Sequence, residues 1–162
     1  MRVLAHLCDL GSAKRHFPPA VLDAIQHAIA ASEHRHRGEI VFAVEGSLPL
    51  VAVARGHGAR DRAHDVFARL RVWNTEHNTG VLVYLLLADH AIEIVADRGI
   101  AAKVAEREWL PICALMQQHF ARGEYRTGAT AGVDAIGELL ARHFPAGGGR
   151  NPDELPDRPV LL

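Results

Sequence analysis

Three polar segments of this 162-residue chain place carboxylate, imidazole and amide side chains close together. They are SEHRHRGE at 32–39, WNTEHN at 73–78 and ADRG at 96–99. Calcium and magnesium prefer oxygen ligands, and the histidines here would also accept a transition metal. Carboxylates held close together raise one another's pKa unless a cation or an arginine neutralises them. The two best candidate metal ligands in these segments are Glu76 and Asp97. Glu33 and Glu39 are candidates for additional ligands.

Arginines in the same segments offer a second explanation. If Arg35, Arg37 and Arg98 pair with the carboxylates, the group is ordinary solvated loop charge. Arg98 is the main competitor, because an arginine among these carboxylates would neutralise them without a metal. It could instead contact an anion or a partner, together with Asn78 and His77. We expect the histidines of the HRH run to be exposed.

Two wholly apolar runs predict buried strands at Glu39–Glu45 and Val81–Leu87. Apolar residues recur at helical spacing between them, which predicts a right-handed crossover and therefore parallel strands. A two-residue turn then leads to Ile92–Ala96, which returns antiparallel and is more polar on one face. The three polar segments are thus expected to meet at one end of the sheet.

The remaining apolar periodicity predicts helices before and after these strands. One begins after Pro18 and Pro19, which suit a first helical turn, and is expected to end at Gly38. Two more follow the third strand, the first of them carrying Trp109. The chain is therefore predicted to be an α/β protein, a three-layer α/β/α sandwich on a small mixed sheet. We expect Trp109 and Trp73 to be buried core residues.

Composition and missing signatures narrow the function. The formal net charge is −1, which gives no reason to expect a nucleic-acid partner. No apolar run is long enough to span a bilayer, and the N-terminal residues lack the apolar centre of a signal peptide, so we expect a cytoplasmic protein. No nucleophile elbow, Walker loop or HExxH is present. A disulfide between Cys8 and Cys113 is not expected.

Longer strings of the sequence resemble the TPM domain family, also called the TPM phosphatase family. The resemblance rests on GEIVFAVE, AHDVFARLRVWNTEHN, NTGVLVYLLLADHAIEIVADRGI and RGEYRTGATAGVDAIGELLARHFP. It divides the chain into an N-terminal extension at 1–16, a TPM-like domain at 17–145 and a Pro/Gly-rich tail at 146–162. We expect the tail to be extended along the surface or partly disordered.

The resemblance implies an α/β/α sandwich, divalent-cation binding and the acid phosphatase activity claimed for plant relatives. The chain reads ADRGI where many relatives have Gly-Tyr-Gly-Leu. The favoured interpretation is a binding or scaffold module that binds calcium or magnesium at one sheet end. The alternative is a metal-dependent acid phosphatase acting on phosphate monoesters. A third hypothesis is an interaction module with a protein partner, itself membrane-associated, and without direct membrane insertion by this chain.

Overall fold

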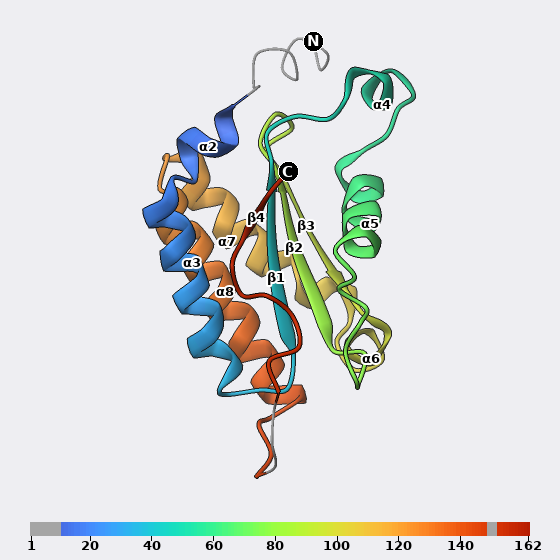
Figure 1. The fold of residues 1–162 in the computed structure, drawn as a ribbon, viewed down its shortest axis with the longest axis vertical. Helices are drawn as coiled ribbons and strands as arrows, with labels where there is room; N and C mark the ends of the chain where they lie inside the picture. The colour runs from blue at the N-terminus through green and yellow to red at the C-terminus, as the bar shows by residue number, and fades with distance from the viewer. Residues whose placement is uncertain (1–10, 149–151) are drawn as a thin grey trace.

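The sheet of this protein has four strands in the order β3-β2-β1-β4, as the computed structural model shows for residues 11–148 and 152–162 (Figure 1). β1 (Glu39–Glu45) pairs in parallel with β2 (Gly80–Leu86), and β2 pairs antiparallel with β3 (Ala91–Ala96). These pairings confirm the predicted strands, crossover and hairpin. The fourth strand, β4 (Val160–Leu161), comes from the tail and was not predicted.

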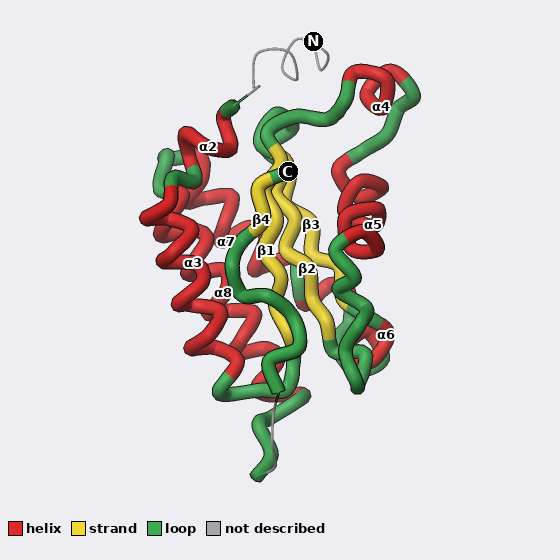
Figure 2. The backbone as a smooth tube through the Cα atoms, in the orientation of Figure 1, coloured by secondary structure: helices red, strands yellow, loops and turns green. Residues whose placement is uncertain are grey.

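Helices cover both faces of the sheet, which confirms the α/β/α arrangement (Figures 1 and 2). One face carries α3 (Pro19–Glu33), α7 (Leu110–Ala121) and α8 (Tyr125–His143). The other carries α5 (Ala59–Arg69). The described residues also form four short helical segments: α2 (Ser12–His16), α4 (Leu50–Ala54), α6 (Arg98–Ala101) and η1 (Glu106–Glu108).

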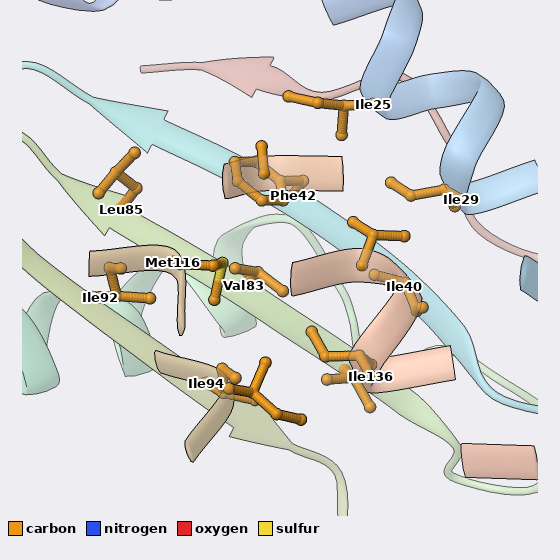
Figure 3. Close-up of a cluster of buried hydrophobic side chains, with 14 of the residues drawn as sticks. Ile25, Ile29, Ile40, Phe42, Val83, Leu85, Ile92, Ile94, Met116 and Ile136 are labelled. Atoms are coloured by element: carbon orange, nitrogen blue, oxygen red, sulfur yellow. The ribbon is translucent and has the colours of Figure 1, made fainter. Parts of the chain in front are cut away.

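Successive side chains of β1 point to opposite faces of the sheet, so the strand contributes to two separate apolar clusters. Ile40 and Phe42 belong to the larger apolar cluster, under α3, α7 and α8, whereas Val41 and Ala43 belong to the cluster under α5. Figure 3 shows side chains of the larger cluster, with those of β1 and β2 pointing toward the helices. Every residue of β1 and β2 is buried, as expected for strands covered on both sides.

Two glycines let α8 lie close to its neighbours. A Cβ at Gly132 would lie 2.4 Å from the sulfur of Met116 on α7. A Cβ at Gly137 would meet the hydroxyl of Ser32 on α3. Since real Cβ atoms do not approach so closely, larger residues there would force the helices apart.

The two tryptophans have different environments. Trp109 is buried in the larger cluster with Ile100 and Val104, as predicted. Trp73 is 51% exposed, so its prediction as a core residue was wrong. It follows Val72, which is fully buried beside Gly80 and takes the inward position at this turn. Arg71, with a φ of 53°, follows the end of α5, where the N–H of Val72 donates to the carbonyl oxygen of Phe67. The following Trp73 is left on the outside.

The tail from residue 152 onward runs along the sheet. β4 pairs in parallel with Ala43 and Val44 of β1, and Leu155 is buried in the cluster under α5. The tail is therefore extended, as expected, and it covers part of the edge of β1. Cys113 is a free thiol, while Cys8 lies outside the described residues. Within the described ranges, no helix has the length and apolar character needed to cross a bilayer.

Candidate functional site

Three carboxylates from three separate elements meet at the end of the sheet where β1 begins. Glu33 is the last residue of α3, Glu39 is the first residue of β1, and Asp153 belongs to the tail. One carboxylate oxygen from each lies within 4.8 Å of the other two. They line a pocket of about 320 Å³, together with Asp157 of the tail and with Ala146 and Gly147.

Backbone amides hold two of these side chains in place. The N–H of Ile40 donates to Oε1 of Glu33 at 3.0 Å. The N–H groups of Glu154 and Leu155 both donate to Oε2 of Glu39 at 3.2 Å. The short connection between α3 and β1 thus brings Glu33 and Glu39 together, and the tail is tied to Glu39 through its backbone.

The pocket favours the protonated form of its carboxyl groups. Burial raises the pKa of Glu33 to about 9, and the charges of Glu39, Asp157 and Asp153 raise it further against the lowering effect of the Ile40 hydrogen bond. Burial likewise raises the pKa of Glu39 to about 7. The pKa of Asp157 is raised by burial and by Asp153, and lowered by a hydrogen bond with Glu33. Such a pocket gains by taking up protons or a cation.

Two of the three arginines expected to neutralise these charges lie elsewhere, whereas the guanidinium of Arg37 lies beside Gly147, which lines the pocket. Arg35 approaches Asp134 of α8 at 4.0 Å, and Arg98 is exposed at the start of α6. Among the described residues, no lysine or arginine forms an ion pair with Glu39 or Asp153. Pairing with Arg35 or Arg98 therefore does not explain the cluster, and Arg37 is near the pocket without an ion pair to Glu39 or Asp153 among the described residues.

Glu76 and Asp97, the two best candidates from the sequence, are not part of this group. The Glu76 side chain is 70% exposed, and its backbone N–H donates to the carboxylate of Glu154 at 2.9 Å. Asp97 is buried, and its Oδ1 accepts a hydrogen bond from the N–H of Arg98 as the N-cap of α6. The start of β2 does lie beside Glu39, which pairs with Gly80. The expectation failed because Glu76 exposes its side chain to solvent, whereas Asp97 follows β3, one strand further from β1, and caps α6.

The WNTEHN and ADRG segments do meet, but through their backbones. The N–H of Gly99 donates to the carbonyl oxygen of Asn78 at 3.0 Å, and a Cβ at Gly99 would clash with the same backbone. Asn78 has a φ of 55°, and His77 is exposed with its Nε2 3.9 Å from Oε2 of Glu76. The predicted anion or partner contacts Arg98, Asn78 and His77 thus lie near one another, away from the acidic pocket.

His36 differs from the exposed histidine that the sequence suggested. Its side chain is fully buried, whereas His34 is exposed as expected. The N–H of Gly38 donates to Nδ1 at 3.1 Å, which assigns the proton to Nε2, and Nε2 donates to Oγ of Ser32 at 2.9 Å. Burial lowers the pKa of His36 to about 4, so the ring is neutral at pH 7 and holds the α3–β1 connection together.

The other end of β1 carries a buried carboxylate of a different kind. Glu45 accepts two hydrogen bonds from Arg62 of α5, from Nε and Nη2, both at 2.9 Å. The hydroxyl of Tyr84 donates to Oε2 of Glu45 at 2.6 Å. Burial and the Glu45 carboxylate raise the pKa of Tyr84. This network, Glu45–Arg62–Tyr84, is charge-paired and attaches α5 to the sheet.

Comparison with known proteins places the chain and its fold in a family. The TPM domain model matches residues 14–139, and the chain belongs to the TPM domain family. The NMR structure of BA42 protein from the psychrophilic bacterium Bizionia argentinensis is similar, with a TM-score of 0.77 and 30% identity. That similarity covers 88% of this chain and 93% of BA42. None of the curated proteins compared with the chain matches it.

Proposed function

We propose that this TPM domain is a binding or scaffold module whose acidic pocket binds a divalent cation, calcium or magnesium. The proposed ligands are Glu33, Glu39 and Asp153. The observation that carries the proposal is the approach of their oxygens within 4.8 Å of one another, from three elements. Oxygen ligands of this kind suit hard cations. Glu76 and Asp97 are left out of the ligand set because their side chains lie outside the group.

The open coordination positions of the cation favour a role in binding a partner over simple structural support, since the tail lines the pocket at the surface. Calcium takes six to eight oxygen ligands and magnesium takes six, so three carboxylates leave several positions for water or for oxygens of a partner. Because the pocket opens beside the tail, a partner that supplies carboxylate or phosphate oxygens would complete the coordination. The cation would then link the domain to its partner.

Calorimetric titration with calcium, magnesium and zinc tests the proposal. We expect calcium or magnesium to bind and to raise the melting temperature, because a ligand that binds the folded state stabilises it. Asp153→Asn should weaken the affinity about tenfold or more, whereas Glu138→Gln, an exposed carboxylate on α8, should leave it unchanged. Absence of binding at millimolar concentration, or equal effects of both variants, would rule out the site.

A metal-dependent acid phosphatase acting on phosphate monoesters is the second candidate. The observation that favours it is the pKa of Glu39, which burial raises to about 7 and which suits a proton acceptor near neutral pH. In this alternative Glu33 and Asp153 would hold a cation that polarises a phosphoryl oxygen, and Glu39, not itself a ligand, would take a proton from the attacking water. Turnover of p-nitrophenyl phosphate, with and without magnesium, tests this, and Asp153→Asn should abolish any metal-dependent part.

We further propose that the module works in the cytoplasm, alongside a protein partner that is itself associated with the membrane. The free thiol of Cys113 is typical of a reducing compartment. The formal net charge of −1 favours neither nucleic acid nor direct binding to anionic lipid. Fractionation of cells that produce the protein, followed by crosslinking, tests the location and the partner together.

A further inference from the structure

A second pocket lies at the opposite end of the sheet from the carboxylates. It has a volume of about 410 Å³ and lies between the end of β2, the β2–β3 turn and the corner formed by α7 and α8. Leu85, Leu87 and Phe120 provide apolar walls, and His90 and Gln117 add polar groups. Mostly apolar pockets of this size with few polar groups are typical of sites for small molecules.

The walls of this apolar pocket are held in place. Tyr125, the first residue of α8, also lines it, and its ring stacks on Phe120 with centroids 5.3 Å apart. The ring of His16 stacks on the Tyr125 ring with centroids 4.3 Å apart, and Phe17 contacts the Tyr125 ring edge-on at 5.6 Å. His90 has a φ of 50°, a backbone conformation that non-glycine residues adopt infrequently. Aromatic stacking and a restricted turn preserve the shape of the pocket without a ligand.

A basic depression adjoins the apolar pocket across Tyr125, which lines both. Arg15 and Arg126 supply its cationic groups, His16 also lines it, and Glu124 is the acidic residue in its lining. The carboxylate of Glu124 is already bound to Arg122 at 3.0 Å and to His119 at 2.6 Å.

The start of α8 adds to the positive character of this depression. The helix has 19 residues and no side-chain cap at its first turn, where Arg126 and Thr127 lie. The amide N–H groups of an uncapped first turn carry partial positive charge. The depression therefore favours an anion, in contrast to the acidic pocket at the other end of the sheet.

We propose that the two pockets together bind a small amphiphile, a medium-chain aliphatic carboxylate. The aliphatic chain lies in the apolar pocket against Leu85, Leu87 and Phe120. The carboxylate reaches past the edge of Tyr125 to Arg126 and Arg15. The apolar walls alone would accept any hydrocarbon chain, so the basic depression is what selects the anion. The proposal is independent of the cation site, since it uses other residues at the other end of the sheet.

Three probes with the same hydrocarbon chain test both parts of the proposal: decanoate, decanol and decyltrimethylammonium. Decanoate and decyltrimethylammonium are titrated below their critical micelle concentrations and decanol below its solubility limit. Binding is followed by calorimetry and by amide shifts in NMR spectra. We expect decanoate to bind most tightly and the ammonium compound most weakly. Equal binding of all three would show that no anion is selected, and binding confined to micellar concentrations would overturn the site.

Two pairs of variants locate the ligand. Ala121→Phe fills the apolar pocket from an exposed position at the end of α7, and it should weaken decanoate binding about tenfold. Its control, Ala114→Phe, lies exposed on the same helix and outside the lining. Arg126→Gln should weaken decanoate about threefold and leave decanol unchanged, whereas Arg142→Gln should affect neither.

The controls decide how a loss is interpreted. The proposal is overturned if Ala114→Phe weakens decanoate as much as Ala121→Phe, or if Arg126→Gln lowers the affinities for decanoate and decanol equally. Calcium titration of the same variants should be normal, because none of these residues contributes to the acidic pocket.

Discussion

β1 begins and ends with a buried glutamate, and the two ends meet opposite electrostatic conditions. Glu45 is 5% exposed and is bound by a bidentate arginine and a tyrosine hydroxyl. Glu39 is 1% exposed, and its neighbours Glu33 and Asp153 are carboxylates. The first arrangement is complete within the protein, whereas the second favours the protonated forms of its carboxyl groups, with the pKa values of Glu33 and Glu39 both raised.

The difference shows how burial of the same side chain has opposite electrostatic consequences in two places. A buried charge that has a full set of partners attaches one element to another, as Glu45 attaches α5 to the sheet. A buried carboxyl group beside other carboxyl groups keeps a raised pKa, as Glu39 does. Burial alone therefore does not identify a functional glutamate; the charges around it do.

Arg62→Met should have the largest effect on stability. It leaves Glu45 buried without its cation, which should lower the free energy of unfolding by about 3 kcal/mol. Urea denaturation measures the loss, and Arg69→Met at an exposed position of the same helix is the control. Adding Glu45→Gln to Arg62→Met should restore part of the stability. A loss equal to that of the control would contradict the assigned role of the network.

Leu155→Ala should have the next largest effect. Leu155 is the tail residue buried in the cluster under α5, and its loss should lower the free energy of unfolding by about 2 kcal/mol. Because Asp153 lies two residues earlier, cation affinity should fall as well. Leu110→Ala removes a leucine that is 65% exposed and should change stability by less than about 0.5 kcal/mol. Normal cation binding by Leu155→Ala would show that the tail is not needed for the site.

The pH dependence of the free energy of unfolding should reveal the acidic pocket at the start of β1. Between pH 7 and pH 9 the folded protein retains the Glu33 proton, whose pKa is raised to about 9, while the unfolded chain has lost it. Stability without a cation should therefore fall as pH rises, by up to about 1.4 kcal/mol per pH unit for one proton.

The titration of His36 does not contribute to the change in stability between pH 7 and pH 9. Its lowered pKa of about 4 makes stability rise with pH only below about 6.5. Glu33→Gln should flatten the decline between pH 7 and pH 9, and denaturation curves measured across that range provide the test. A decline that persists unchanged in Glu33→Gln would assign it to other groups.

Glu76→Gln should have the smallest effect. Its side chain is 70% exposed, so both the free energy of unfolding and the cation affinity should stay within about 0.5 kcal/mol of the wild-type values. The same calorimetric titration serves as the measurement. A clear loss of affinity in this variant would return Glu76 to the ligand set and move the site toward β2.

The sequence predicted the strand pairings because apolar runs and a two-residue turn determine them locally. It predicted half of the acidic pocket for the same reason, since Glu33 and Glu39 flank one short connection. Asp153 was missed because the tail has no periodicity, and its docking depends on contacts with distant residues. The run NPDELPD, with three acidic residues, was the available signal. Burial of His36 depended on a hydrogen bond to Ser32 that spacing alone did not indicate.

The docking of the tail also has a consequence for how the chain folds. The hydrogen bond from Leu155 to Glu39 joins residues 116 positions apart, whereas the bond from Ile40 to Glu33 spans seven. Contacts that close long loops form slowly, because the entropy of closure is lost before the contact is gained. The sheet of β1, β2 and β3 therefore forms first, and during that interval the edge of β1 is open to another chain. Refolding at high concentration should then favour intermolecular strand pairing, until the tail arrives and completes both the edge and the pocket.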